Sequence, residues 1–295
     1  MVHLMIAQPP VMSTQKLRGG VRVIHQINGG LGRARNAGLC IAEGEYIGFV
    51  DADDYVKPEM FQKLYGVAVR FNAEIATCNY YELHGDNLST KERFSCYGSL
   101  INLKDTFPEL FGIHSSGLLW FVWKSIYQSA MLKKHGIVFT DERIVEDSIF
   151  NLSVFAVAGR MAFIQEPLYI YDLTDNLSLT RAPYIKGYPY NLLRGYEEKI
   201  KIYQSNGISV PWQELKWYTM EHTLPTLIMN AMGHPNGLLG IASALREIRN
   251  CEMIEHAFQS ISVNVIKSNL KYIAFLLRSR LFYLAGLALW WRRNV

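Results

Sequence analysis

Three acidic residues, Asp51, Asp53 and Asp54, follow directly after the apolar run Tyr46–Val50. Such a run is typical of a strand that is buried on both faces of a parallel sheet. In open α/β sheets, ligands bind outside the carboxyl ends of the strands, which is where these carboxylates would lie. Carboxylates this close repel one another, and a divalent cation relieves the repulsion. The stretch therefore predicts either a Mg²⁺ or Mn²⁺ site or a solvated turn, in which Asp is common.

Two other charged positions could complete such a site. Glu146 and Asp147 precede the apolar run Ile149–Ala158, which predicts a helix with an acidic first turn. A carboxylate there is stabilised by the helix dipole, so it can serve either as a cap or as a general base. Arg35 lies on the flank of the apolar face of a helix predicted over residues 31–42. It either extends to solvent or binds an anion.

The elements that would position these side chains alternate between strands and helices. After a strand near Val21–Ile24, the turn Asn28-Gly29-Gly30 precedes the first helix, and Asn28 is expected to cap it. A helix from Pro58 to Phe71 and a strand over Glu74–Tyr81 follow. Phe163–Ile170 contains a proline, which predicts a short edge strand.

The two ends of the chain differ from this alternating pattern. Residues 1–20 show no clear period and predict an irregular segment. From residue 183 onward strands are not expected, and helical patterns occupy four stretches, namely 192–203, 212–229, 238–258 and 263–291.

Composition narrows the function classes. The chain has 295 residues, of which 49% are hydrophobic and 19% charged, as in a globular protein. Its four cysteines form no CxxC pair, which disfavours structural zinc and favours a reducing compartment. Neither a GxGxxG dinucleotide motif nor a GxxxxGK[ST] phosphate loop occurs. No feature indicates a nucleic-acid-binding fold.

The last 36 residues are strongly basic. Between Ser260 and Val295 there are six Lys or Arg residues and no acids, whereas the rest of the chain has a small negative net charge. The apolar run Leu281–Trp291 is shorter than the ~18–20 residues that span a bilayer. It is compatible with a helix docked at a membrane surface and equally with an ordinary packed terminal helix.

Four motifs in this order resemble the family 2 glycosyltransferases: NGGLGRARNAG, a strand running into DADD, W-K-x-x-Y, and ED before an apolar helix. The similarity runs over about residues 21–181, and 169–171 resembles the Y-x-Y segment of that family, although Asp172 replaces a basic residue. The resemblance implies a GT-A (Rossmann-like) α/β fold over 21–182, a mixed sheet with helices on both faces, followed by a helical region over 183–295. The family's first strand–helix–strand is not recognisable in the sequence, so an N-terminally truncated domain is expected.

The resemblance also implies roles for individual residues. Asp147 matches the catalytic base, and Arg35 and Asp51 match residues near the nucleotide-sugar. Asp53 matches the acid of a DxD motif that binds Mn²⁺ or Mg²⁺. Three residues match the acceptor side of the family's site, namely Trp123, Lys124 and Glu146.

The implied function is inverting transfer of a sugar from a nucleotide-sugar donor, expected to be a UDP-sugar, to a hydroxyl of a glycan or lipid-linked acceptor. The expected location is cytoplasmic, with or without peripheral contact to the inner face of the plasma membrane through the C-terminal basic helix. One alternative is a non-catalytic remnant that acts as a membrane-surface or complex-forming protein. Another is an aspartate-nucleophile phosphohydrolase, which the sequence disfavours because Tyr55 follows Asp54 where Thr or Val would be expected.

Overall fold

The chain forms two compact units in the computed structural model, which describes residues 4–7, 13–16, 21–91, 100–103, 121–141, 145–174 and 184–294. The first unit comprises Met1–Phe111, Ser115–Asp175 and Glu198–Ile208. The second comprises Gly112–His114, Asn176–Glu197 and Ser209–Val295. Helix α6 (Tyr188–Ser205) therefore contributes to both units.

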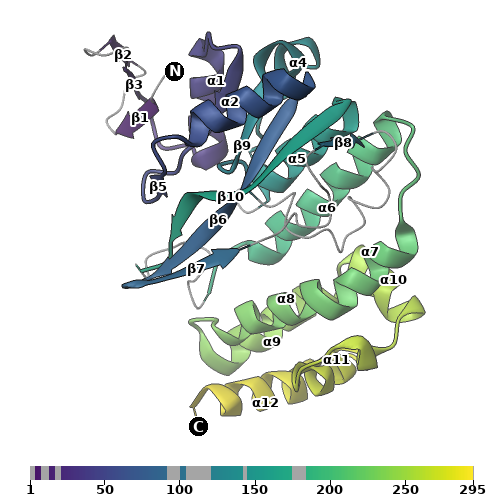
Figure 1. Cartoon of the computed structure of the whole chain (residues 1–295). Coiled ribbons are helices and arrows are strands. Elements are labelled where there is room, and N and C mark those ends of the chain that lie inside the picture. Colours follow the sequence, from purple (N-terminus) through teal and green to yellow (C-terminus); the bar gives the residue numbers. More distant parts are fainter. Residues whose placement is uncertain are drawn as a thin grey trace. The chain divides into compact units, whose positions relative to one another are not determined.

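The first unit is built on a mixed sheet whose two longest strands, β6 and β10, run side by side (Figure 1). These two strands are parallel, whereas the other pairings in this sheet are antiparallel. The path through the sheet is β4 (Tyr46–Gly48), β9 (Ser125–Gln128), β6 (Ile75–His84), β10 (Arg160–Asp172) and β5 (Tyr55–Val56), with β7 (Asn87–Lys91) beside β6 and β8 (Leu100–Asn102) beside β10. The predicted mixed α/β sheet is confirmed.

Helices cover both faces of this sheet. Successive residues of a strand point to opposite faces, and β9 illustrates the consequence. Ile126 packs in an apolar cluster with residues of α2 (Met60–Phe71), whereas the ring of Tyr127 lies 5.3 Å from that of Phe150 in α5 (Glu146–Val157). Two further helices of this unit are α1 (Leu31–Ile41) and α4 (Ser129–Lys134).

The prediction that Phe163–Ile170 is a short edge strand is wrong. Strand β10 extends from Arg160 to Asp172 and pairs with β6 on one side and with β8 and β5 on the other. Pro167 is tolerated there because the register with β6 shifts on both sides of it, so the ladder needs no N–H at that position.

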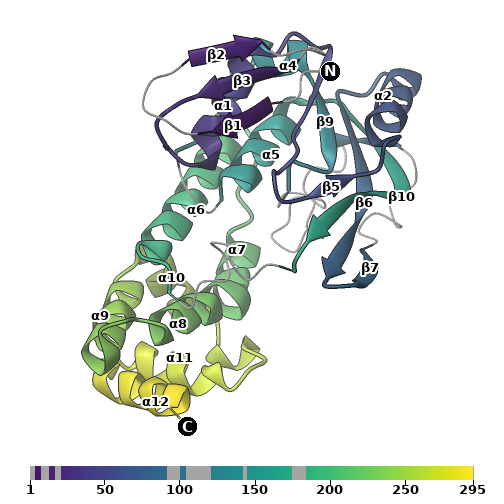
Figure 2. The ribbon, with the colours of Figure 1, turned by 90° about the vertical axis from the view of Figure 1, so that its left-hand side faces the viewer.

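The prediction that residues 1–20 are irregular is also wrong for two short stretches. β1 (Leu4–Ala7) pairs in parallel with β3 (Arg22–His25), and β2 (Ser13–Lys16) pairs antiparallel on the other edge of β3. Figure 2 shows this three-stranded sheet in the first unit. Strands of four residues carry too little sequence periodicity to be recognised without their partner.

Asn28 does not cap the first helix as predicted. Its side-chain oxygen accepts a hydrogen bond from the Gly30 N–H at 3.1 Å, which closes a local turn, and Gly30 is the residue at the N-cap of α1. Gly30 has φ of 92°, a conformation that glycine adopts readily.

The second unit is helical, as predicted. Its helices after α6 are α7 (Trp212–Tyr218), α8 (Leu224–Met232), α9 (Gly237–Arg249), α10 (Glu252–Ser260), α11 (Leu270–Arg278) and α12 (Phe282–Asn294). A π-helical turn over Thr219–Thr223 joins α7 to α8, and a 3₁₀ turn covers Val263–Val265. The stretch predicted to be helical over 238–258 forms two helices, α9 and α10. The stretch over 263–291 also contains two helices, α11 and α12, and the chain turns between them at Arg280, which has φ of 58°.

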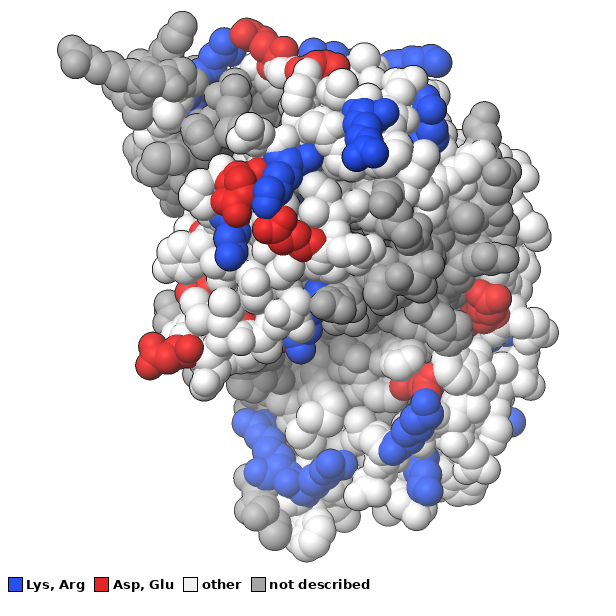
Figure 3. All heavy atoms as spheres, in the orientation of Figure 1, with Lys and Arg blue, Asp and Glu red and all other residues white. Residues whose placement is uncertain are grey.

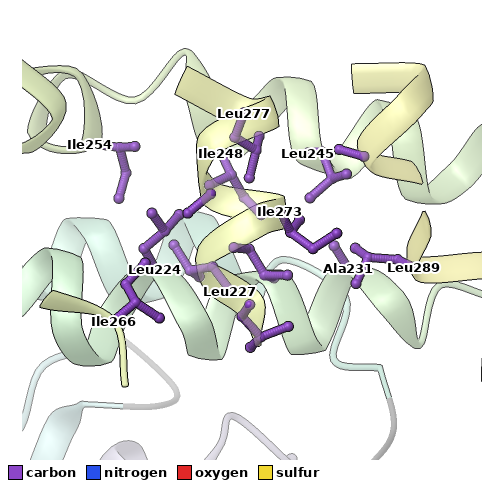
Figure 4. Packing of buried hydrophobic residues seen from close by; sticks show 14 of the residues in the cluster. Leu224, Leu227, Ala231, Leu245, Ile248, Ile254, Ile266, Ile273, Leu277 and Leu289 are labelled. Carbon is purple, nitrogen blue, oxygen red and sulfur yellow. The ribbon is translucent and has the colours of Figure 1, made fainter. Parts of the chain in front are cut away.

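The helices of the second unit enclose one apolar core. Figure 4 shows Leu224 and Leu227 of α8, Leu245 and Ile248 of α9, and Ile273 of α11 converging there. All five side chains are buried, so the helices are held by shared apolar area. No helix in the described ranges is both long enough and apolar enough to cross a bilayer.

Candidate active site

Charged side chains from three segments come together in the first unit. The segments are α1, the turn between β4 and β5, and the first turn of α5. Strand β4 ends at Gly48, and the turn that carries Asp51, Asp53 and Asp54 connects it to β5. A Cβ at Gly48 would lie 2.5 Å from the Phe61 ring, so glycine allows α2 to pack closely against the strand that leads into this turn.

Arg35 of α1 lies at the centre of this group and is only 6% exposed. Its Nη2 donates to Asp51 Oδ1 at 2.8 Å, and its Nη1 donates to Asp147 Oδ1. The same Nη1 lies 3.9 Å from Glu146 Oε1. Burial opposes the charged form of Arg35, but these carboxylates outweigh it, and the pKa of Arg35 is raised. The sequence suggested an anion partner for Arg35, and in this structure that partner is a set of carboxylates of the chain itself.

Asp147 is held in the first turn of α5. Its Oδ2 accepts a hydrogen bond from the backbone N–H of Val122 at 3.3 Å. Burial raises the pKa of Asp147 to about 7, with Glu146 and Asp51 adding to the rise while Arg35 lowers it. A carboxyl group that titrates near neutral pH suits a general base.

Asp54 is used to hold the turn in place. The hydroxyl of Tyr169 donates to Asp54 Oδ2 at 2.6 Å, and the backbone N–H of Asp172 donates to Asp54 Oδ1 at 2.9 Å. The Tyr169 oxygen in turn accepts from the backbone N–H of Asp51 at 3.2 Å. Burial raises the pKa of Asp54 to about 6, although both hydrogen bonds to it act in the opposite direction. Sequence reasoning missed this anchor, because no pattern relates two segments more than 100 residues apart.

Comparison with known proteins identifies the chain. The model of the family "Glycosyl transferase family 2" matches residues 10–123. The chain is 36% identical over 239 residues to the uncharacterised glycosyltransferase EpsJ of Bacillus subtilis, an alignment covering 80% of this chain and 69% of that protein. The chain belongs to glycosyltransferase family 2, and it is a glycosyltransferase.

Other glycosyltransferases show weaker similarity. The uncharacterised glycosyltransferase YibD of Escherichia coli is 29% identical over 217 residues, which cover 66% of this chain and 61% of YibD. The poly(ribitol-phosphate) β-N-acetylglucosaminyltransferase TarS of Staphylococcus aureus is 26% identical over 157 residues, covering 53% of this chain and 26% of TarS.

The fold comparison agrees with the family assignment. The crystal structure of S. aureus TarS 1-349 in complex with UDP-GlcNAc superposes with a TM-score of 0.59 and 16% sequence identity, covering 93% of this chain and 76% of that one. At this identity the likeness concerns the fold, and it confirms the GT-A-like architecture that the sequence predicted.

Two of the residues matched to the acceptor side lie in the interior of the glycosyltransferase. Trp123 is buried and its ring stacks 4.1 Å from that of Tyr169. Lys124 is also buried, with its ammonium group 5.6 Å from the centre of the Phe121 ring. Trp123 belongs to the apolar cluster that includes Tyr80 and Tyr169, and an acceptor role for Trp123 and Lys124 stays a prediction.

Glu146, the third of these residues, lies beside the charged group. It is 8% exposed, and its Oε2 has no hydrogen-bond partner among the described residues. Burial raises the pKa of Glu146, and Arg35 lowers it. An unpaired buried carboxylate oxygen is costly, so Glu146 is suited to accept a hydrogen bond from a ligand hydroxyl.

The residues present fit a Mg²⁺ or Mn²⁺ ion that takes most of its ligands from a diphosphate. No cluster of three metal-ligating side chains is found within the described ranges. Asp51 is occupied by Arg35 and Asp54 by Tyr169, whereas Asp53 is exposed and accepts no hydrogen bond from the described part of the chain. One free carboxylate together with substrate phosphates is a common way of holding these ions.

Proposed function

We propose that this glycosyltransferase transfers a sugar from a UDP-sugar to a hydroxyl of a glycan or lipid-linked acceptor, with inversion at the anomeric carbon. The convergence of Arg35, Asp51 and Asp147 beyond the end of strand β4 is the observation that carries the proposal. The TarS structure with UDP-GlcNAc, which shares the fold, supports a uridine nucleotide-sugar as the donor class.

Asp147 is the base in this proposal. Its Oδ1 is held by Arg35. Within the described part of the chain its Oδ2 accepts a single hydrogen bond, from Val122 at 3.3 Å, so Oδ2 is the atom that takes the proton from the acceptor hydroxyl. The hydroxyl oxygen attacks the anomeric carbon as the bond to the nucleoside diphosphate breaks, and one displacement inverts the configuration. Glu146 accepts a hydrogen bond from the acceptor and orients it.

Asp53 would hold Mn²⁺ or Mg²⁺. When bound, the ion would neutralise the charge that develops on the departing diphosphate. Asp51 and Arg35 would line the donor side, where Arg35 also keeps Asp147 and Asp51 at a fixed separation.

The proposed location is cytoplasmic, because the described cysteines, Cys40, Cys78 and Cys251, are free thiols and fit a reducing compartment. A lipid-linked acceptor would place the reaction at the inner face of the plasma membrane. The C-terminal basic helix is the part of the chain that we assign to this contact.

The decisive experiment measures transfer and donor binding together. With a panel of UDP-sugars, Mn²⁺ and a mixture of candidate acceptors, the Asp147→Asn variant should lose about 10²–10⁴-fold in kcat while still binding the donor. The Asp141→Asn variant is the matched control, because Asp141 is largely exposed and lies 3.8 Å from its ion-pair partner Arg33. More than a tenth of wild-type transfer in Asp147→Asn would exclude Asp147 as the base.

Calorimetry separates this proposal from the non-catalytic alternative. A folded chain that gives no heat with any UDP-sugar and Mn²⁺ would favour a remnant that serves as a membrane-surface or complex-forming protein. Donor binding that depends on Asp53 and on the metal would favour the transferase.

A further inference from the structure

Helix α12 carries no charged side chain over residues 282–291. Its inner arc consists of Ala285, Gly286 and Leu289, which are buried, and a Cβ at Gly286 would lie 3.3–3.4 Å from side chains of α9. Over residues 282–291 the opposite arc is exposed and consists of apolar and aromatic residues, namely Tyr283, Leu284, Leu287, Ala288, Trp290 and Trp291. A helix on the surface of a globular protein normally carries charged and polar side chains on that arc.

Helix α11, which packs against α12, also exposes apolar side chains. Tyr272 and Phe275 are exposed on this helix, and Leu281 is exposed in the turn that joins it to α12. Helices α11 and α12 are neighbours in the second unit (Figures 1 and 2). We call this surface the apolar face and define it as Tyr272, Phe275, Leu281, Tyr283, Leu284, Leu287, Trp290 and Trp291.

Basic residues accompany the apolar face, and residues 260–295 contain no acid. Figure 3 shows Lys and Arg side chains, with uncharged surface between them, on the lower part of the view, where the helices of the second unit lie. Lys271, Arg278 and Arg292 form no ion pair with any described residue. The other three bases contact the protein: Lys267 pairs with Glu221 at 2.9 Å, Arg280 lies 3.7 Å from Glu255, and Arg293 donates to the carbonyl oxygen of His234 at 2.9 Å.

We propose that the apolar face docks on an anionic phospholipid bilayer, with α11 and α12 lying in the plane of the interface. Leucine and phenylalanine side chains would enter the acyl boundary, and the tryptophan and tyrosine rings would lie at headgroup depth. Lys271, Arg278 and Arg292 supply the charge that complements anionic headgroups.

Charge also disfavours a second copy of this chain as the occupant. A two-fold symmetric dimer through this surface would place the same patch on both sides, so the bases of one copy would face those of the other without any acid from this segment. A bilayer that contains phosphatidylglycerol has the opposite charge and needs no complementary pockets.

This inference deepens the membrane contact named in the proposed function, but its test requires neither donor nor acceptor. Failure of vesicle binding would leave sugar transfer untouched, and failure of transfer would leave vesicle binding untouched.

The experiment is co-sedimentation of the full chain with vesicles of phosphatidylcholine alone and of phosphatidylcholine with 30% phosphatidylglycerol. We expect at least tenfold stronger binding to the anionic vesicles and a progressive loss of binding as NaCl is added. Leu287→Glu should reduce binding at least tenfold. Combined Arg278→Gln and Arg292→Gln should reduce it roughly fivefold for each arginine removed.

The matched control is Val69→Glu, which introduces the same charge at an exposed apolar position of α2 in the first unit. It should bind vesicles as wild type does, and circular dichroism should report the same fold for all variants. Absence of binding to anionic vesicles, equal binding to both vesicle types, or unchanged binding of Leu287→Glu would each overturn the proposal. The proposal would also be overturned if the wild-type chain formed a dimer that Leu287→Glu dissociates and did not bind vesicles.

Discussion

The charged group of the first unit and the apolar core of the second are both buried, but they are held together in different ways. The first consists of one guanidinium, Arg35, surrounded by the carboxylates of Asp51, Glu146 and Asp147. The core of the second consists only of apolar side chains from several helices. Apolar contacts are non-directional and numerous, so each one is replaceable in part. A charge network is directional, and each member depends on the presence of the others.

This difference has a functional consequence. A desolvated carboxyl group can have its pKa moved into the range where it exchanges protons at neutral pH, and an apolar core offers no such group. In the first unit, therefore, the burial of carboxyl groups disfavours their charged form. The apolar core of the second unit contributes stability and contains no group that titrates near neutral pH.

Removal of the central cation should produce the largest effect. Arg35→Met would leave three carboxylates without their buried partner, and breaking a buried ion pair in this way costs about 3–5 kcal/mol. Urea unfolding of the purified variant measures the loss. Arg33→Met is the matched control, because Arg33 pairs with Asp141 in an exposed bridge worth less than about 1 kcal/mol. Equal stability of the two variants would contradict the central role of Arg35.

Part of the pH dependence of stability should also originate in the charged group. The pKa of Asp147 is raised from 3.8 to about 7 in the folded chain, so between these values the folded state binds a proton that the unfolded state has lost. Stability from this residue is therefore present in acid and falls as pH rises from about 4 to about 7, by up to about 4 kcal/mol for the full shift. Transfer should rise over the upper part of the same range, because the base must be ionised.

Melting temperatures and kcat/KM measured from pH 5 to pH 8 test both statements. Asp147→Asn should make this loss of stability smaller and leave the part that Asp54 contributes in the same direction, because the pKa of Asp54 is raised to about 6. Asp141→Asn should leave the profile as in wild type. A wild-type melting temperature that increases steadily across the interval would contradict the assignment.

The contrast also explains what could be predicted from the sequence. The helices of the second unit follow from apolar spacing, which is local, although the breaks at Asn250-Cys251 and at Arg280 were not anticipated. Asp51 and Asp147 could be nominated from their positions after a predicted strand and at the start of a predicted helix. Arg35 could be assigned only through the family resemblance, because its spacing alone also fits a side chain that extends to solvent. The pairing of Arg35 with Asp147, and that of Asp54 with Tyr169, joins segments more than 100 residues apart. Which residues pair in this way depends on the three-dimensional fold, and neither the spacing nor the type of the residues predicts it.

A single truncation in the apolar core should have a smaller and purely structural effect. Leu245→Ala on α9 removes a fully buried side chain and should cost about 3 kcal/mol from lost transfer energy and the cavity left behind. Leu239→Ala on the same helix is the control, because Leu239 is 71% exposed and should change stability by less than about 0.5 kcal/mol. Activity per folded molecule should remain at the wild-type level in both variants. A selective loss of kcat in Leu245→Ala would show that the core of the second unit does more than stabilise.

The smallest effect tests the anchor of the acidic turn. Tyr169→Phe removes the hydroxyl that donates to Asp54 and accepts from the Asp51 N–H, and it should cost about 1–2 kcal/mol. Because the Tyr169 hydrogen bond lowers the pKa of Asp54, its loss should raise that pKa above about 6. Tyr65→Phe is the control, since the Tyr65 hydroxyl bonds Glu45 on the surface and its loss should be nearly neutral. If Tyr169→Phe weakens donor binding more than it lowers stability, the anchor acts by positioning Asp51 and Asp53 for the nucleotide-sugar. If stability falls and donor binding does not, the contact only stabilises the fold, as the packing of the apolar core does in the second unit. The functional difference between the two regions is then confined to the residues around Arg35.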